Sequence, residues 1–257
     1  MSSGSSTLGK GLDLLRLMGQ YPSGAPAAVF AKDSGLPFST VYRLLNSLVA
    51  SGFAEYDAAT KQYRPGLVIF ELSSKVASVR GYDGTVLPVL QRLSKTTNES
   101  CLFAVRDGVD TVTVHTVDGP EFRQTTDPGD RLPIHVSSMG KAILAGMPAQ
   151  EADALIEQLS FAPHTERTVT DAHVLRDQIA QGRELGYLYQ SEEVDLGMNA
   201  IGTAVVGPDG HVMGAIAIAA PLFRATKDDL IQHRDALDAA AYQLSMALAT
   251  VQGAVVR

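Results

Sequence analysis

The chain has 257 residues, of which 45% are apolar, and it carries a formal net charge of −7 and a single cysteine. This length exceeds one typical domain and allows two buried cores, while the lone Cys101 excludes a disulfide framework and a thiolate metal cluster. Residues 1–80 hold eight basic and five acidic side chains, a net +3, so the remainder carries −10. A basic excess confined to the N-terminal part favours a nucleic-acid-binding region there.

The N-terminal part is predicted to contain three helices. The first covers residues 9–20, the second begins at residues 27–31 and stops at the breaker Gly35-Leu36-Pro37, and the third begins at Ser39-Thr40. Two helices joined by so short a turn form a helix-turn-helix. We expect Ser39 or Thr40 to cap the third helix and Gly52 to end it in a left-handed conformation.

The third helix has one apolar stripe at spacings of three and four, formed by Val41, Leu44, Leu45 and Leu48, so its other side is expected to face solvent. Two alternating runs follow, at residues 53–56 and 62–64. They predict a short hairpin that completes a winged helix-turn-helix.

In a helix-turn-helix, the N-terminal half of the second helix enters the major groove, where polar side chains meet base edges and phosphates. The residues that fit this role are Ser39, Thr40, Tyr42, Arg43 and Asn46, with Lys61 and Arg64 on the hairpin. Arg43 can fork onto a guanine or a phosphate and Asn46 can pair with an adenine; the sequence does not choose between base and backbone contacts. The alternative is that these polar residues form the ordinary solvated face of a small helical domain.

A further helical pattern runs from Pro65, expected in its first turn, to Arg80 and ends before Gly81. We interpret it as a linker helix, followed by another helix at residues 86–96. The expected organisation is a winged helix-turn-helix DNA-binding domain at 1–64, a linker helix at 65–80, and a second domain at 81–257.

The second domain alternates strand and helix patterns. Strands are expected at 101–105 and 111–117, joined by the hairpin signal Asp107-Gly108, at 187–192, and in a second hairpin at 200–206 and 212–219. Residues 134–136 precede a helix at 139–146; further helices are expected at 151–159, 171–185 and 227–250, the last with a capping-box-like start at Thr226 and Asp229. The predicted class is α+β with a mainly antiparallel sheet.

Three motifs, in order, resemble the IclR family of bacterial transcriptional regulators. Residues 35–45 (GLPFSTVYRLL) look like the family's recognition helix, residues 131–142 (RLPIHVSSMGKA) resemble its central signature, and Gly186-Tyr187, Glu192-Glu193 and Gly197 match a third motif. The likeness extends from about Leu8 to Leu248. It implies an N-terminal winged helix-turn-helix, a linker helix, and a C-terminal GAF-like domain that binds a small molecule, in dimers that pair as tetramers.

The resemblance also implies an effector site. Family members that sense small acids hold them with amides at the start of the central-signature helix and with an Asp, a Cys and two Ser. By position, the amides fall on Ser138 and Met139, the Asp on Gln190, the Cys on Ala200, and the two Ser on Ala217 and Ala219. A helix N-terminus favours a carboxylate, but the other four positions have become one amide and three methyl groups.

These departures favour an effector with a larger apolar body. Our hypothesis is an aromatic or other bulky organic acid, with its carboxylate at Ser138 and Met139, its body against the alanines, and Gln190 or His135 reading a polar end. One alternative is that the alanines fill the sheet core and the pocket is vestigial. Another is a DNA-binding protein whose second domain only oligomerises.

An enzymatic interpretation has little support. Ser138 and Lys141 match the S-x-x-K spacing of serine acylases, the basis of a remote alternative as an acyl hydrolase, but no partner motif accompanies them. The six histidines lack metal-binding spacings, and Glu192, Glu193 and Asp195 are predicted to form a solvated turn. We therefore expect no catalytic residues, no metal and no cofactor.

The sequence as a whole indicates a ligand-responsive transcription factor that controls a catabolic operon, as repressor or activator. Its expected partners are double-stranded operator DNA, an organic acid and further copies of itself. The first residues do not resemble a signal peptide and the longest nearly apolar run, at residues 212–223, is too short to span a membrane, so the expected location is the cytoplasm.

Overall fold

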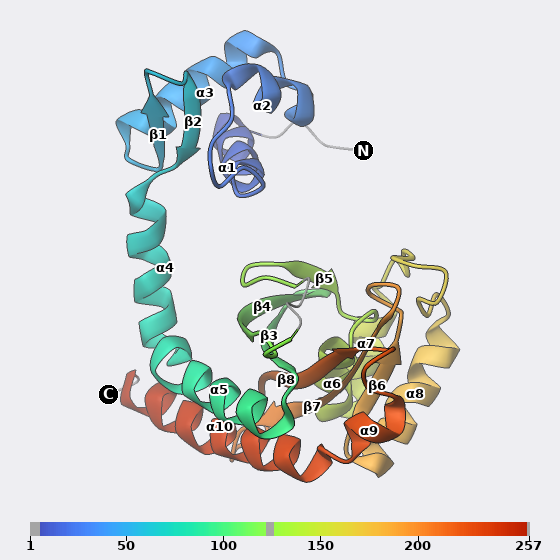
Figure 1. Cartoon of the computed structure of the whole chain (residues 1–257). Coiled ribbons are helices and arrows are strands. Elements are labelled where there is room, and N and C mark those ends of the chain that lie inside the picture. Colours follow the sequence, from blue (N-terminus) through green and yellow to red (C-terminus); the bar gives the residue numbers. More distant parts are fainter. Residues whose placement is uncertain (1–5, 122–125, 256–257) are drawn as a thin grey trace. The chain divides into compact units, whose positions relative to one another are not determined.

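The computed structural model describes residues 6–121 and 126–255 of the chain (Figure 1). The chain divides into two compact units between Ala77 and Ser78. The first unit has its own buried core, and the second has a core on each face of its sheet.

The first unit is a winged helix-turn-helix, as predicted. It contains α1 (Thr7–Met18), α2 (Ala27–Ser34), α3 (Phe38–Ala50), β1 (Ala54–Asp57) and β2 (Gln62–Pro65), followed by α4 (Leu67–Val79), which continues past Ala77. Leu14, Phe30, Leu45 and Tyr63 supply the core from three helices and the hairpin. The apolar stripe of α3 is therefore buried, and its polar arc is left for solvent.

Two local predictions for this unit are wrong. The N-cap of α3 is Pro37, with no side-chain capping hydrogen bond, instead of Ser39 or Thr40. The reason is that the ring of Pro37 fixes φ near −55° in an extended conformation, so that the helix begins at the next residue. Pro65 pairs with Ala54 at the end of β2 and does not belong to the first turn of α4.

The end of α3 and the end of α4 agree with the sequence. Gly52 adopts φ +77° directly after Ser51, and Gly81 adopts φ +73° after α4. A π-helical turn, Tyr82–Val86, then leads into α5 (Leu87–Thr97). No residue of α4 is buried, although Leu67, Phe70 and Val76 are apolar.

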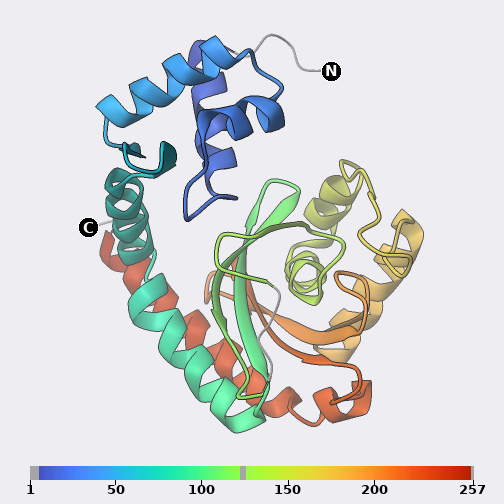
Figure 2. The ribbon, with the colours of Figure 1, turned by 45° about the horizontal axis from the view of Figure 1, so that its top comes forward.

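The second unit is built on a six-stranded antiparallel sheet in the order β5-β4-β3-β8-β7-β6. Its strands are β3 (Ser100–Asp107), β4 (Asp110–Val117), β5 (Arg131–Pro133), β6 (Leu188–Ser191), β7 (Met198–Val206) and β8 (Val212–Pro221). Figure 2 shows the curled sheet with α5 and α10 (Arg234–Val255) along one side and α6 (Ser138–Gly146) and α8 (Ala172–Leu185) on the other. Helix α7 (Ala149–Ile156) packs with the second group. The α+β class with an antiparallel sheet is confirmed.

The two faces of strand β8 carry side chains of different size. Ile216 and Ile218 pack towards α5 and α10, whereas Ala217 and Ala219 face α6. Small residues on that face allow α6 to lie close to the sheet, because a Cβ built on Gly202 of neighbouring β7 would sit 3.1 Å from the backbone carbon of Ser138. The sheet thus supports the start of α6 at close range.

The C-terminal helix differs from its prediction. The structure contains α9 (Lys227–Ile231) and then α10, separated by Gln232 and His233, where one continuous helix was expected. The predicted capping box at Thr226 and Asp229 is present. No helix of the described residues is long and apolar enough to cross a membrane.

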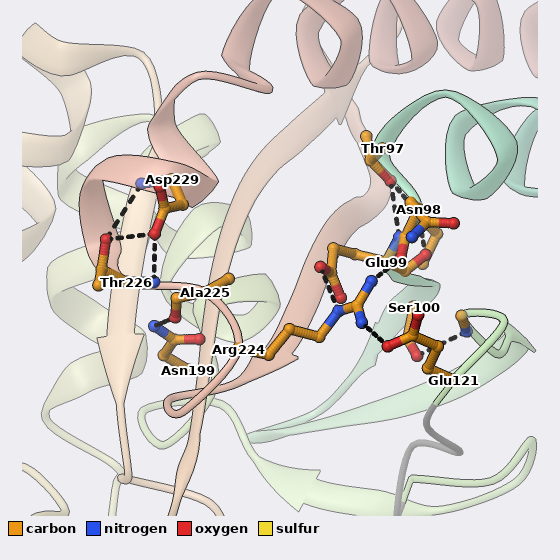
Figure 3. Close-up of polar contacts among 12 residues, drawn as sticks. Thr97, Asn98, Glu99, Ser100, Glu121, Asn199, Arg224, Ala225, Thr226 and Asp229 are labelled. Carbon is orange, nitrogen blue, oxygen red and sulfur yellow. Dashed lines mark hydrogen bonds and ion pairs between the residues drawn. The ribbon is translucent and has the colours of Figure 1, made fainter.

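A polar cluster fastens the β8–α9 connection to the start of β3 (Figure 3). The guanidinium of Arg224 donates to Glu99 Oε1 at 2.8 Å and to the Asn98 carbonyl oxygen at 3.2 Å, and it also pairs with Glu121. Glu99 is buried and directly precedes β3, so this pair ties the N-terminal end of that central strand to the segment after β8.

Candidate DNA-reading surface and effector cavity

The polar residues of α3 lie on its exposed arc. Ser39, Tyr42, Arg43 and Asn46 are exposed, and Thr40 is half-buried. The hairpin is anchored to this helix because the buried Tyr63 donates its hydroxyl hydrogen to Asn46 Oδ1 at 3.5 Å. The first unit therefore presents α3 and the hairpin as one connected surface.

The two arginines of this surface differ in their electrostatic state. Arg64 pairs with Glu55, its cross-strand neighbour, at 2.9 Å. Arg43 forms no ion pair within the described part of the chain, and Lys61 is exposed at the end of the hairpin turn with φ +57°. Within the described residues, the positive charge of Arg64 is thus neutralised by a carboxylate and that of Arg43 is not.

One residue of this surface, Phe38, was not predicted from the sequence. Phe38, the first residue of α3, is 55% exposed, and its ring stacks on the ring of Tyr42. The available signal was an apolar residue on the polar side of the predicted stripe, directly after Pro37.

The start of α6 has free backbone donors. Ser137 caps the helix by accepting the Gly140 N–H at 3.0 Å. The N–H groups of Ser138 and Met139 have no hydrogen-bond partner among the described residues. Because helix N-termini carry partial positive charge, this end of α6 suits an anion.

These two residues border a cavity of about 40 Å³. The structure brings six of the seven predicted effector residues together around it: Ser138, Met139, Gln190, Ala200, Ala217 and Ala219. The rest of the wall was not predicted and comprises Leu102, Thr126, Leu132, Ser137, Val194, Asp195 and Met198. Leu132 and Ser137 lie within the central signature at residues 131–142, whereas Leu102, Thr126 and Met198 come from strands and loops outside the quoted motifs.

Gln190 supplies a polar group to the wall. Its side chain is buried, and its Oε1 accepts the Glu193 N–H at 3.0 Å. The side-chain nitrogen of Gln190 has no hydrogen-bond partner within the described residues and remains as a donor.

His135, the seventh predicted effector residue, lies outside this cavity. It is buried, its ring lies 5.1 Å from that of Phe161, and neither ring nitrogen has a hydrogen-bond partner in the structure. Burial lowers the pKa of His135, which favours the neutral form. His135 packs against Phe161 instead of lining this cavity, and its reading of an effector stays a prediction.

Glu193 does not belong to a solvated turn. Its Oε1 lies 2.5 Å from Nζ of Lys141, and both side chains are buried. Glu193 Oε2 also accepts the Val169 N–H at 3.3 Å. Burial lowers the pKa of Lys141 and the Glu193 carboxylate opposes that shift. The neighbouring Glu192 and Asp195 are half-buried, so the prediction of a solvated turn is wrong chiefly for Glu193.

One further cavity adjoins this site, and another lies apart from it. One of about 220 Å³ shares Thr126, Leu132, Val194 and Asp195 with the smaller cavity and so adjoins it. Another, of about 420 Å³, lies elsewhere in the second unit, between Arg80, Arg106 and the β7–β8 turn, and contains none of the predicted site residues. Within the described residues, no group of three or more His, Cys, Asp and Glu side chains could hold a metal ion.

Comparisons with known proteins agree with this architecture. The IclR helix-turn-helix domain matches residues 7–58, and the bacterial transcriptional regulator IclR C-terminal domain matches residues 81–246. The chain is 28% identical over 246 residues to the HTH-type transcriptional repressor AllR of Escherichia coli, covering 95% of this chain and 91% of that protein.

Two solved structures share the fold. IclR of Thermotoga maritima superposes with a TM-score of 0.75 at 23% identity, over 95% of this chain and 98% of that one. An IclR homolog from Microbacterium hydrocarbonoxydans, complexed with 4-hydroxybenzoate, gives a TM-score of 0.77 at 22% identity, over 95% and 100% of the two chains. Together, the two domain matches and the fold place the chain in the IclR family of ligand-responsive, DNA-binding transcriptional regulators.

Proposed function

We propose that this regulator controls a catabolic operon in the cytoplasm and that its effector is an aromatic or other bulky organic acid. The observation that carries the proposal is the pair of unpartnered N–H groups at Ser138 and Met139, which border a buried cavity walled by alanines. The same cavity collects the residues that the family resemblance assigns to the effector.

The carboxylate of the acid binds the two backbone N–H groups at the start of α6, where the helix dipole adds to the attraction. Lys141 lies one turn further along, but Glu193 already neutralises its ammonium. The backbone amides and the side-chain nitrogen of Gln190 are therefore the donors, and Ala200, Ala217 and Ala219 contact the apolar body.

The cavity is too small for an aromatic acid unless part of its wall moves. A volume of about 40 Å³ holds water-sized groups and no aromatic ring. A ring enters when the wall shared with the adjoining cavity of about 220 Å³, at Thr126, Leu132, Val194 and Asp195, moves aside. Effector binding is thereby coupled to a rearrangement of this wall.

Calorimetry tests the effector class. Benzoate and 4-hydroxybenzoate, the latter bound in one solved neighbour, should bind at least about tenfold tighter than two- and three-carbon oxo acids, because the alanines replace hydrogen bonds with apolar contact. Tighter binding of the short acids would overturn the proposal. Ala219→Val fills the cavity and should abolish binding, whereas Ala154→Val, on the exposed side of α7, should leave it unchanged.

For the DNA output, we propose that residues 1–64 form the reading head and that its contacts are the seven residues Ser39, Thr40, Tyr42, Arg43, Asn46, Lys61 and Arg64. Dimers, which pair as tetramers, present these heads to two half-sites. The exposed Leu67, Phe70 and Val76 of α4 support self-association, because no residue of that helix is buried in a single chain. Light scattering at the concentrations used for DNA binding measures the oligomeric state, and a monomer would refute the proposed self-association.

The effector would act by population shift, favouring one spacing of the heads over another. The helix α4, within the proposed linker at 65–80, joins the head to the proposed effector domain at 81–257 and is the proposed transmitter. A promoter fragment from a neighbouring catabolic operon should bind the protein, with an affinity that changes when benzoate is added.

The small cavity volume favours a second candidate, in which the C-terminal domain only oligomerises. A ligand at 100 times its dissociation constant stabilises its protein by about 2.7 kcal/mol. If no organic acid of the panel raised the melting temperature, this second candidate would hold.

An acyl hydrolase is disfavoured because Lys141 is paired with Glu193 and is no free base for Ser138. Ester turnover that disappears in Ser138→Ala would reverse this conclusion.

A further inference from the structure

An aromatic pair occupies the N-terminal turns of α3. Phe38 and Tyr42 are 55% and 49% exposed, and their ring centroids lie 6.2 Å apart with planes inclined by 18°. A spacing of four residues places the two side chains one above the other on a helix. The pair is thus a continuous apolar surface at the start of the helix, uncovered within its own unit.

The rest of the helix gives this surface a fixed position. Val41, Leu44 and Leu45 are buried in the core of the first unit, and Asn46 contacts the hydroxyl of Tyr63 from the hairpin. On a helical projection, Phe38 and Tyr42 lie at one edge of the exposed arc and Arg43 lies towards the other. The apolar pair therefore stands beside polar side chains on the same exposed arc, on a rigid support.

We infer that Phe38, backed by the ring of Tyr42, reads the 5-methyl group of a thymine in the operator. This inference rests on the proposed placement of α3 in the major groove. The N-terminal residues of a recognition helix contact base edges there, and the thymine methyl is the apolar group that base pairs present in that groove. A phenylalanine ring has no hydrogen-bonding atom for a phosphate, so an apolar contact is the one it can offer.

The experiment removes only the methyl group. Sites are first selected from a randomised duplex pool with the full-length protein at fixed salt. Each thymine of the selected site is then replaced in turn by deoxyuridine, which keeps the base-pairing edge and lacks the methyl. Affinities are measured for wild type, Phe38→Ala and Phe38→Leu, with Phe223→Ala as a control that removes another exposed aromatic.

One uracil position should weaken wild-type binding by about fourfold, the value of one buried methyl-sized group. Phe38→Ala should bind the thymine and uracil forms of that site with equal affinity. Phe38→Leu should keep part of the wild-type difference in affinity between the two forms, and Phe223→Ala should keep all of it. Circular dichroism and the melting temperature check that the variants are folded.

Two results overturn the inference while leaving the DNA-reading function intact: a selected site in which no uracil weakens wild-type binding, or a uracil penalty that persists in Phe38→Ala. Failure of the full-length protein to select any sequence above background would instead refute the proposed reading surface, and this inference with it.

Discussion

Nζ of Lys141 and Oε1 of Glu193 lie 2.5 Å apart in the interior of the second unit, although the two residues are separated by 52 positions in sequence. Lys141 stands one turn after the free N–H groups of α6, and Glu193 precedes Val194 and Asp195 of the cavity wall. The ion pair therefore connects α6 to the segment that forms part of the wall of the proposed effector cavity. Removing one partner would leave a buried charge without compensation.

Glu193→Gln should lower the free energy of unfolding by about 3–5 kcal/mol, since the Lys141 ammonium remains buried and unpaired. Urea denaturation measures the loss. The double variant Lys141→Met with Glu193→Leu should recover most of it, because neither charge is then buried. Glu192→Gln is the matched control, since its Oε1 accepts the Gly197 N–H and an amide oxygen can replace it. Equal losses in the two Glu→Gln variants would contradict the assignment.

Arg43→Ala should remove specific binding to the selected DNA site, because an uncompensated guanidinium is lost from the reading arc. Effector affinity, measured by calorimetry, should not change. Arg64→Ala should weaken binding less, since Glu55 already holds that guanidinium. Gel-shift titrations at one fixed salt concentration compare the two variants. Retention of specific binding by Arg43→Ala would refute its role.

Gly140→Ala should destabilise the protein by roughly 3 kcal/mol or more, because overpacking against rigid backbone is costly. The added Cβ would lie 2.0 Å from the carbonyl oxygen of Ile134, which cannot move without shifting the start of α6. Gly84→Ala, where the added carbon meets open space beyond its own stretch of backbone, should be near neutral. Thermal denaturation distinguishes the two, and similar melting temperatures would disprove the close approach.

Cys101 should resist thiol reagents in the folded protein. Burial raises its pKa to about 12 from a usual 9.0, which lowers the thiolate fraction at pH 8 roughly a thousandfold. Labelling with a chromogenic disulfide should therefore be slow until the chain is unfolded in urea. Rapid labelling of native protein at pH 8 would contradict the buried position.

The same thiol predicts a pH dependence of stability. The unfolded thiol ionises above pH 9 while the folded thiol stays protonated up to about pH 12. Its contribution is thus complete below pH 9 and is lost as the pH rises through this interval. Comparison of wild type with Cys101→Ala between pH 8 and pH 11 isolates it. A stability difference that stays constant over this range would exclude the shift.

The helix-turn-helix was predictable because its signals are local. The spacing of Val41, Leu44 and Leu45 defines the buried stripe of α3, and Gly52 marks its end within the same short stretch. Two helix boundaries, the start of α3 and the end of α9, were predicted wrongly from these local signals. Pro37 makes α3 begin at Phe38, one residue before Ser39-Thr40. Helix α9 ends at Ile231, and the following Gln232 and His233 include no glycine or proline to signal the break.

The cavity was only partly predictable. The positions on α6, β6, β7 and β8 followed from the family resemblance, and the antiparallel register of the three strands brings theirs together. The contacts of His135 and Glu193 depend on Phe161 and Lys141, which are distant in sequence. Such pairings arise from tertiary packing and leave no periodic trace in the sequence.

The two unlike faces of β8 have an evolutionary consequence. The isoleucine face carries the contacts that hold α5 and α10, so the alanine face can change without disturbing them. Replacing Ala217 or Ala219 by serine adds one oxygen to the cavity wall and leaves the opposite layer untouched. With this wall as the proposed effector site, a lineage can acquire a new signal molecule by single substitutions on one strand while the opposite layer and the DNA-reading unit stay unchanged.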